Sequence, residues 1–520
     1  MEYLFYGDQV KYPEYTVRHA WDKPPDVIDE TLIAETIETD VVIVGGGIAG
    51  LSTAARLSQL GVKSIVLEKF HGIVSHGAHV ASVGSKIQRE NGVIIDKKQF
   101  ARDWMRICGS RVNEDLLWLF INKSEEAFEW LLECAGDEAS PVLHGGNYKG
   151  PDFTEYPGTQ FLSKKKDSKY KFTGAALVCE IMEDIALTGG ARVIRKTKVE
   201  QLEKTDGRVT AAIAKDENGL YRRYKGARGI VLATGDIGGN PEMLSEFSPL
   251  GLKPAKNGYY PPGLNTGDGH KMGYWAGGAF EDGPWALSLH IIAYAYYCFF
   301  FLHVNREGNR FMNEDTWIQA KAIRCLMQPR GDFAYTIFDA KWFEECTKLA
   351  QYGGGQFVDP LICVYGRPWD ENNDVQKSID NYIKNGLCVC CDTIAELAEK
   401  IGVPVDNLIK TVNRYNELYE LGDDPDYGKR ANLLTPIVKP PYYALKWGPA
   451  LLNVFGGLLI DTKMRVLDRD HRPVSGLLAV GNVSGGLYGV DYPLLLSGNS
   501  HGRALTWARA AAETLYADEA

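Results

Sequence analysis

Apolar and polar positions alternate along this chain in a pattern that predicts an α/β core. A short apolar run, Val41–Val44, leads into a glycine-rich turn, and residues 48–60 then carry apolar side chains at helical spacing. A second apolar run follows at Ser64–Leu67, and similar runs recur at 229–233 and 476–480, each beside glycine. The order strand, helix, strand is typical of a parallel sheet covered by helices.

Other segments complete the expected elements. Apolar spacing predicts further helices at 98–108, 114–135, 174–188, 393–401, 405–418 and 501–515. Residues 192–198 and 208–215 are expected to form paired strands. The stretch 135–164 is rich in glycine, proline and serine, so we expect a loop there.

The character of the chain changes along its length, which predicts a divided domain. Residues 1–37 are rich in charge and proline and are expected to form an N-terminal arm. Residues 38–282 and 448–520 both carry βαβ-like patterns, so we expect them to form two parts of one nucleotide-binding domain. The aromatic-rich stretch 283–447 between them is expected to form an inserted cap that carries the substrate site.

The glycine-rich turn carries a dinucleotide fingerprint. Gly45 would make the tight turn, Gly47 would let the backbone approach a pyrophosphate, and Gly50 would let the helix pack against the strand. Glu68 follows the second strand, where a carboxylate can bind ribose hydroxyls. The free N–H groups at the start of helix 48–60 favour the pyrophosphate anion. The sequence therefore predicts a bound dinucleotide.

Charge and composition argue against several partners. The 520 residues carry a formal net charge of −10 and no run of four Lys or Arg, which argues against nucleic acid. The first residues lack a signal-peptide pattern, so a cytoplasmic location is expected. Residues 284–304 carry no formal charge, but their histidines and tyrosines suit a pocket wall better than a membrane span.

The ten cysteines do not predict a metal site. Cys388, Cys390 and Cys391 form a cluster, but no second CxxC pair completes a four-ligand set. Reduced thiols are the simpler interpretation, and no bound metal is expected.

Several motifs together resemble one flavoprotein superfamily. They are Ala233-Thr234-Gly235, Thr266–Gly269, Val304–Glu314, Pro440–Tyr443 and Gly476–Gly486, in addition to the fingerprint. In this order they resemble the fumarate reductase/succinate dehydrogenase and 3-ketosteroid dehydrogenase flavoproteins, over about residues 38–515. The resemblance implies that the dinucleotide is FAD, bound by a Rossmann-like, three-layer α/β domain that an α+β cap interrupts.

The resemblance also implies which residues bind FAD. Leu496–Ser500 would open the last helix and direct backbone N–H groups at the pyrimidine edge of the flavin. His76 and His79 fall where some relatives attach FAD to histidine, but noncovalent FAD is expected. The expected cofactor-binding residues are Gly45, Gly47, Ala49, Gly50, Glu68, Lys69, Val199, Ala233, Gly235, Asp268, Asn482, Ser497, Asn499 and Ser500.

The cationic side chains that fumarate reductases use, and that this sequence lacks, indicate which class of substrate to expect. Fumarate reductases hold a dicarboxylate with histidine and arginine and use a further arginine as proton donor. The matching positions hold Leu452 or Asn453 and Tyr492, and Ala340–Phe343 offers no arginine. Because a carboxylate needs such cationic partners, fumarate reduction is not expected.

The residues that stand there instead resemble the 3-ketosteroid dehydrogenases. Asn482 and the Tyr492-Pro493 pair match that family, which implies that Tyr492 binds a substrate carbonyl. Tyr296 or Tyr297 falls where the family has a cap tyrosine for proton transfer, although packing is the alternative role for either.

We therefore expect an FAD-dependent oxidoreductase that reduces, or forms, a C=C bond α,β to a carbonyl group. The substrate would be hydrophobic, and ketosteroid-like or aromatic, although Leu494–Gly498 departs from the glycine-rich ketosteroid pattern. A hydride would pass at flavin N5 and a proton through tyrosine, and a protonated phenol favours reduction. Electrons would come from, or pass to, a separate partner, since the chain has no cytochrome or cluster motif.

Two alternatives stay open. The first is a reductase of an unsaturated carboxylic acid, with the acid bound by cap arginines such as Arg324 or Arg330. The second is a flavoprotein electron-transfer subunit that serves a partner chain.

Overall fold

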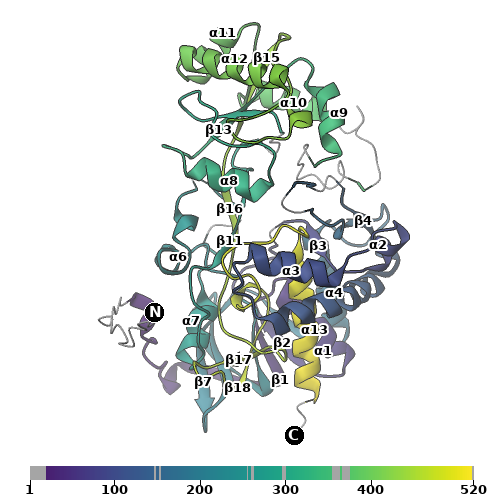
Figure 1. The fold of residues 1–520 in the computed structure, drawn as a ribbon. Helices are drawn as coiled ribbons and strands as arrows, with labels where there is room; N and C mark the ends of the chain where they lie inside the picture. The colour runs from purple at the N-terminus through teal and green to yellow at the C-terminus, as the bar shows by residue number, and fades with distance from the viewer. Residues whose placement is uncertain are drawn as a thin grey trace, which may run out of the picture.

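The predicted parallel sheet forms the body of the molecule, at the bottom of Figure 1. The computed structural model describes residues 19–75, 77–145, 148–151, 154–254, 256–258, 263–295, 300–353, 364–365 and 375–517. Eight strands form the main sheet, in the order β17-β18-β9-β1-β2-β6, with β8 added beside β9 and β7 beside β8. They are β1 Ile33–Val44, β2 Ser64–Leu67, β6 Arg192–Ile194, β7 Thr197–Thr205, β8 Arg208–Asp216, β9 Tyr221–Leu232, β17 Arg465–Leu467 and β18 Pro473–Ala479.

Parallel pairing and buried helices explain why these apolar runs form one core. β1 pairs in parallel with β2 and β9, β9 with β18, and β2 with β6. Helices α1 (Ile48–Gln59) and α13 (Asn499–Ala517) contact the sheet, while α4 (Glu114–Ala135) and α5 (Ala175–Thr188) pack beside them. The run Val41–Val44 is buried between these layers, which removes its apolar surface from water. The expected Rossmann-like α/β class is confirmed.

The cap forms a separate layer at the top of Figure 1. Its four strands are antiparallel and have the order β12-β13-β15-β14. A second apolar cluster, which includes Leu408, Val412 and Leu418, fills the space between this sheet and its helices. The elements are β12 Leu302–Val304, β13 Ala334–Asp339, β14 Cys388–Cys391, β15 Tyr442–Trp447, α8 Ile318–Leu326, α9 Trp342–Ala350, α10 Val375–Lys384, α11 Ile394–Ile401 and α12 Val405–Leu421.

Smaller elements connect the two parts. β11 and β16 pair antiparallel and lie between the cap and the main sheet in Figure 1. A second small sheet has the order β3-β5-β4. These elements are β3 His79–Ala81, β4 Ala139–Leu143, β5 Thr159–Lys164, β10 Lys256–Asn257, β11 Ala286–His290, β16 Ala450–Phe455, α2 Lys86–Glu90, α3 Lys97–Ile107, α6 Pro241–Phe247 and α7 Asp268–Trp275. The exact domain boundaries remain a prediction.

Two expectations about local structure were wrong. The stretch 135–164 is not a plain loop, because it contains β4 and β5. Pro141 lies in β4, the edge strand of its sheet, where a residue without an N–H is tolerated. The predicted strand 192–198 is two strands, since Lys196 adopts a φ of 54° and separates β6 from β7.

The uncharged run 284–304 does not form one helix. Its described residues include β11 and β12, and none of the described helices of the chain is long and apolar enough to cross a bilayer. Cys388 and Cys391 are buried free thiols in β14. Among the residues that the structure describes, no group of three His, Cys, Asp or Glu side chains could hold a metal ion.

Candidate active site

A cavity lies where the strand β1, the start of helix α1 and the start of helix α13 meet. Eleven of the fourteen residues expected to bind FAD line it: Gly45, Gly47, Ala49, Glu68, Lys69, Val199, Ala233, Gly235, Asp268, Asn482 and Ser500. Gly50, Ser497 and Asn499 do not. The cavity is also lined by Val44, Ile48, Leu67, Val74, Ser75, Thr197, Lys198, Thr234, Leu264, Asn265, Met272, Asn453, Val480, Gly481, His501 and Ala504.

Three glycines shape the turn before α1. Gly45 has a φ of 110°, and a Cβ placed on it would lie 2.4 Å from the carbonyl oxygen of Ala233. A Cβ on Gly50 would lie 1.9 Å from the carbonyl oxygen of Gly45, so only glycine lets the helix pack here. By contrast, no heavy atom lies within 4 Å of a Cβ built on Gly47. This open space at a helix N-terminus fits a pyrophosphate.

Glu68 is held in place by backbone groups at the cavity wall. Its Oε2 accepts a hydrogen bond from the Gly46 N–H at 2.6 Å, and its Oε1 accepts one from the Phe70 N–H at 2.7 Å. Each carboxylate oxygen keeps acceptor capacity for a hydroxyl group. The predicted ribose-binding carboxylate is therefore oriented before any ligand binds.

Lys69 and Asp268 form an ion pair at the same cavity. The Lys69 Nζ lies 2.9 Å from Asp268 Oδ2, and the Lys271 Nζ lies 3.2 Å from Oδ1. Burial would raise the pKa of Asp268, but Lys69, Lys271 and Lys198 outweigh it and lower that pKa to about 2. The carboxylate is thus ionised at neutral pH.

The segment before α13 is folded on itself rather than open to the cavity. Asn499 donates from its amide to the carbonyl oxygens of Pro493 at 3.0 Å and Leu496 at 2.9 Å. The Ser497 hydroxyl donates to Glu155 at 2.6 Å. These contacts explain why both side chains lie outside the cavity lining.

Tyr492, the predicted carbonyl-binding residue, does not line the cavity; it lies behind Ser500, which does, within an aromatic layer. Its ring stacks on Phe455 at a centroid distance of 4.4 Å, and Tyr488 lies 5.4 Å away. The Ser500 N–H, at the start of α13, donates to the Tyr492 hydroxyl oxygen at 3.3 Å. Burial raises the pKa of Tyr492 to about 12, although this hydrogen bond opposes the shift, so the phenol is neutral.

Histidines gather beside the cavity, and sequence reasoning missed the roles of two of them, His144 and His501. His501 lines the cavity, and its Nδ1 lies 2.7 Å from the carbonyl oxygen of His79. The rings of His79 and His144 are 4.9 Å apart, and His290 is close enough to influence the pKa of His79. Burial lowers the pKa of both His144 and His290 to about 4, so these imidazoles are neutral. The uncharged run 284–304 was the one signal that pointed to His290.

Several ring nitrogens in this group have no partner. In the described part of the chain, His79 Nε2, His144 Nδ1 and His290 Nδ1 are buried without a hydrogen bond. Buried polar atoms are normally paired, so an unpaired group of this kind marks a place where a ligand can bind. Among the described histidines of this group, His501 lines the cavity, while His79, His144 and His290 do not.

Among the residues that the structure describes, no arginine lines the cavity. Its cationic side chains are Lys69 and Lys198. Asn453 lines the cavity at one of the two positions matched to the histidine of fumarate reductases. Arg503 is buried behind Asn482, to which its Nη2 donates at 2.5 Å, and its guanidinium covers the ring of Tyr488.

The expected cap residues cannot all be placed. Tyr296, Tyr297 and His76 lie outside the described residues. Tyr294, their neighbour, packs under the Lys446 Nζ at 4.2 Å from its ring centroid.

Comparisons with known proteins agree with this geometry. The model of the FAD binding domain family matches residues 40–500. The probable fumarate reductase Ifc3 of Shewanella frigidimarina is 27% identical, over 95% of this chain and 77% of that protein. The vinyl phenol reductase of Lactiplantibacillus plantarum is 24% identical, over 89% of this chain and 94% of that protein.

A solved structure shows the same fold. The 3-ketosteroid-delta4-(5alpha)-dehydrogenase of Rhodococcus jostii RHA1 superposes with a TM-score of 0.71 and 22% identity, over 94% of this chain and 99% of that one. The predicted superfamily, the FAD cofactor and the predicted class of flavin-dependent oxidoreductase are confirmed by the family match and these relatives. The chain belongs to the FAD binding domain family, within the fumarate reductase/succinate dehydrogenase flavoprotein superfamily, and is an FAD-dependent oxidoreductase.

Proposed function

We propose that this enzyme reduces the C=C bond α,β to a carbonyl group in a hydrophobic, ketosteroid-like or aromatic substrate. The observation that carries the proposal is Tyr492, a buried neutral phenol whose oxygen accepts the N–H of Ser500, a residue of the cofactor-cavity lining. It occupies the position at which the sequence match with fumarate reductases leads us to expect an arginine. A phenol binds a carbonyl oxygen but does not neutralise a carboxylate.

The residues that would hold FAD follow from the cavity. Gly45 and Gly47 would accept the pyrophosphate at the start of α1, and Glu68 would bind the ribose hydroxyls. The Thr234 hydroxyl is buried without a partner in the described structure and lines the cavity, so it is available to the cofactor. FAD, when bound, supplies the hydride.

Tyr492 would stabilise the charge that develops on the substrate oxygen. Its oxygen accepts the Ser500 N–H, and the phenol proton would be the donor to a substrate oxygen. The N-terminus of α13 lies beside it and favours negative charge. The Tyr492 hydroxyl thus acts as a preorganised donor, and Tyr296 or Tyr297 remains our candidate for proton transfer.

The histidine group supports a neutral substrate. His144 and His290 keep a pKa of about 4, so they offer hydrogen bonds without positive charge. The names of two similar proteins, a vinyl phenol reductase and a 3-ketosteroid dehydrogenase, agree with an aromatic or steroid-like substrate. Electrons would come from a separate donor.

A reductase of an unsaturated carboxylic acid is the second candidate, because a fumarate reductase is among the similar proteins. The two cap arginines suggested to bind the acid do not favour this second candidate. Arg324 is exposed and donates to the Asn313 carbonyl oxygen, and Arg330 is exposed and pairs with Glu307. Neither lines the cofactor cavity.

The first test replaces the phenol. Tyr492→Phe removes the hydroxyl, and we expect turnover to fall by about 10²–10³-fold, as for the loss of one oxyanion donor. The 450 nm absorbance of bound FAD should be unchanged. Tyr488→Phe is the matched control, since its buried hydroxyl has no partner among the described residues, and it should keep wild-type turnover. Equal turnover in Tyr492→Phe would refute the role of Tyr492.

The second test compares substrates. Enones, vinyl phenols and enoates are supplied anaerobically with a reduced dye, and dye oxidation is followed. Turnover of enones or vinyl phenols supports the proposal, while turnover of enoates alone supports the second candidate. Reduced flavin that no small molecule oxidises would instead indicate an electron-transfer subunit.

A further inference from the structure

A second cavity adjoins the cofactor cavity on the side of the N-terminal arm. The two share Lys198, Val199, Asp268 and Met272 in their linings. The remaining residues of the second cavity are Pro25, Asp26, Ile28, Glu200, Gln201, Tyr221, Lys271 and Trp275. Arm residues therefore form one wall of a space that continues from the cofactor site.

One end of the arm is anchored by Trp21. This side chain is 8% exposed and packs among Phe247, Tyr274 and Phe280 at centroid distances of 5.7, 5.9 and 5.9 Å. The Trp275 Nε1, in α7, donates to the Trp21 carbonyl oxygen at 2.8 Å. The anchor thus connects the arm to the helix that begins at Asp268 and lines both cavities.

Gln201 anchors the other end. Its Oε1 accepts a hydrogen bond from the Ile28 N–H at 3.0 Å, and its Nε2 donates to the Asp26 carbonyl oxygen at 2.5 Å. Residues 23–27 between the anchors are exposed, and Val27 is 85% exposed. The segment therefore has no apolar core of its own, and its path depends on the two anchors.

The position of this wall indicates what it covers. The pyrophosphate cradle lies at Gly45 and Gly47, and Glu68 takes the ribose, so the adenosine end of FAD extends away from Tyr492. Trp275, Met272 and Ile28 offer apolar surface for a flat ring, and Lys198 and Lys271 offer positive charge near phosphate.

We propose that residues 19–32 form a strap that closes the adenosine end of the cofactor pocket and retains FAD. The strap acts on the cofactor and not on the substrate, because it lines the cavity beside Lys198 and Asp268 and not the wall that holds Asn482 and Ser500. Its contribution is to slow FAD release. The proposal goes beyond the reaction proposed above and does not depend on the substrate.

The test measures FAD release from the holoenzyme. The rise in flavin fluorescence after dilution gives the dissociation rate for the wild type and for Gln201→Ala. Because this substitution removes three hydrogen bonds to the arm, with Pro25, Asp26 and Ile28, release should be about tenfold faster. Gln328→Ala is the matched control, since this cap glutamine makes two side-chain hydrogen bonds that do not involve the arm, and its release rate should be unchanged.

A second measurement follows the strap directly. Amide hydrogen exchange of residues 26–32 should be slower in the holoenzyme than in FAD-stripped protein, and Gln201→Ala should remove this difference. Turnover per bound flavin at saturating FAD should stay at the wild-type value. Equal exchange with and without FAD, or unchanged FAD release in both Gln201→Ala and Trp21→Ala, would overturn the proposal. A change in turnover alone would concern the proposed reaction and not the strap.

Discussion

Burial sets the protonation states around the cavity wherever no opposite charge is near. Tyr492 stays a neutral phenol because burial raises its pKa to about 12, and His290 stays neutral because burial lowers its pKa to about 4. Asp268 behaves differently because Lys69 and Lys271 lie close to it. The site therefore separates a neutral end near Tyr492 from a charged end near Lys69.

Glu281 gives a prediction about pH at this scale. It accepts N–H bonds from Gly457 at 3.2 Å and Gly486 at 2.9 Å, yet burial raises its pKa to about 7. Because the pKa of Glu281 is higher in the folded state than in the unfolded chain, the protonated side chain contributes stability at low pH. This contribution is lost as pH rises from about 4.5 through 7. Glutamine does not ionise, so Glu281→Gln lacks this loss. The unfolding free energy of the variant minus that of the wild type should therefore rise by about 3 kcal/mol from pH 4 to pH 8.

Urea unfolding at both pH values checks this expectation. Glu138→Gln serves as a control of opposite sign, because the Ser168 hydroxyl and the Lys169 N–H lower the pKa of Glu138. In the wild type, ionised Glu138 contributes stability at pH values above its pKa in the unfolded chain, and this stability is lost as pH falls. A pH-independent difference for Glu281→Gln would contradict the assigned protonation state.

At the scale of elements, the turn from β1 into α1 combines two different uses of glycine. Gly50 is needed for packing, because its Cβ would overlap the Gly45 carbonyl oxygen. Gly47 is the N-cap of α1 and faces open space. One turn therefore serves the fold at one position and the cofactor at another.

The two glycines should separate stability from cofactor binding. Gly50→Ala forces α1 away from β1, and we expect a loss of about 1–3 kcal/mol in the free energy of unfolding of the FAD-free protein. Gly47→Ala should cost less than about 1 kcal/mol in the same measurement. It should nevertheless weaken FAD binding at least about tenfold, because the methyl group occupies the pyrophosphate space.

Urea unfolding and titration of FAD-stripped protein with FAD provide the two numbers. If Gly47→Ala bound FAD as tightly as the wild type, the pyrophosphate would not lie against this glycine.

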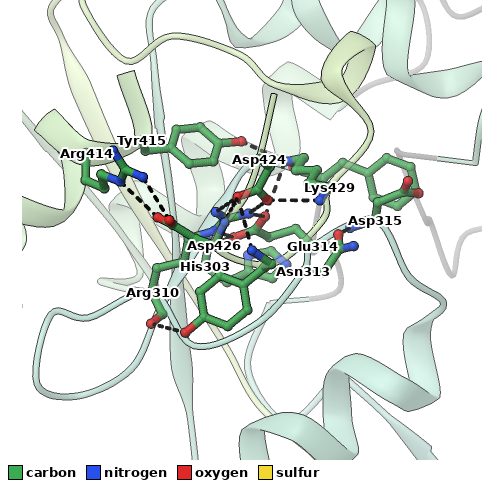
Figure 2. Close-up of polar contacts among 12 residues, drawn as sticks. His303, Arg310, Asn313, Glu314, Asp315, Arg414, Tyr415, Asp424, Asp426 and Lys429 are labelled. Atoms are coloured by element: carbon green, nitrogen blue, oxygen red, sulfur yellow. Dashed lines mark hydrogen bonds and ion pairs between the residues drawn. The ribbon is translucent and has the colours of Figure 1, made fainter. Parts of the chain in front are cut away.

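At the scale of the whole molecule, a buried ionic cluster lies within the cap, as Figure 2 shows. Arg310 donates to Glu314 at 2.8 Å and to Asp424 at 2.8 Å, and both carboxylates are fully buried. Lys429 lies 3.4 Å from Glu314, and burial lowers its pKa to about 8. The cluster joins the loop after β12 to the segment after α12, which are far apart in the chain.

Removing Arg310 should therefore destabilise the cap. Arg310→Met leaves Glu314 and Asp424 buried with one arginine fewer, and we expect a loss of about 3–5 kcal/mol in unfolding free energy. Arg414→Met is the control, since its partner Asp426 and its own side chain are partly exposed, and it should cost less than about 1 kcal/mol.

Amide exchange of α12 and urea unfolding measure both effects. If the two variants lost similar unfolding free energy, the buried cluster would stabilise the cap no more than an exposed ion pair does.

The sequence by itself determined the features that lie within one short stretch of chain. The turn Gly45–Gly50 and the helix after it were predictable because each depends on neighbours a few residues away, and the position of Glu68 follows from the fixed length of the strand–helix–strand unit. Glycine and proline content misled the prediction at 135–164, because proline at an edge strand does not prevent pairing.

Tertiary structure alone decided the contacts between distant segments. Lys69 meets Asp268 across 199 positions, Ile28 meets Gln201 across 173, and His501 meets His79 across 422. Periodicity shows which face of an element is buried, but not which other element covers it. The histidine group, the stacking of Tyr492 on Phe455 and the arm over the second cavity therefore emerged only once the sheets and helices were packed.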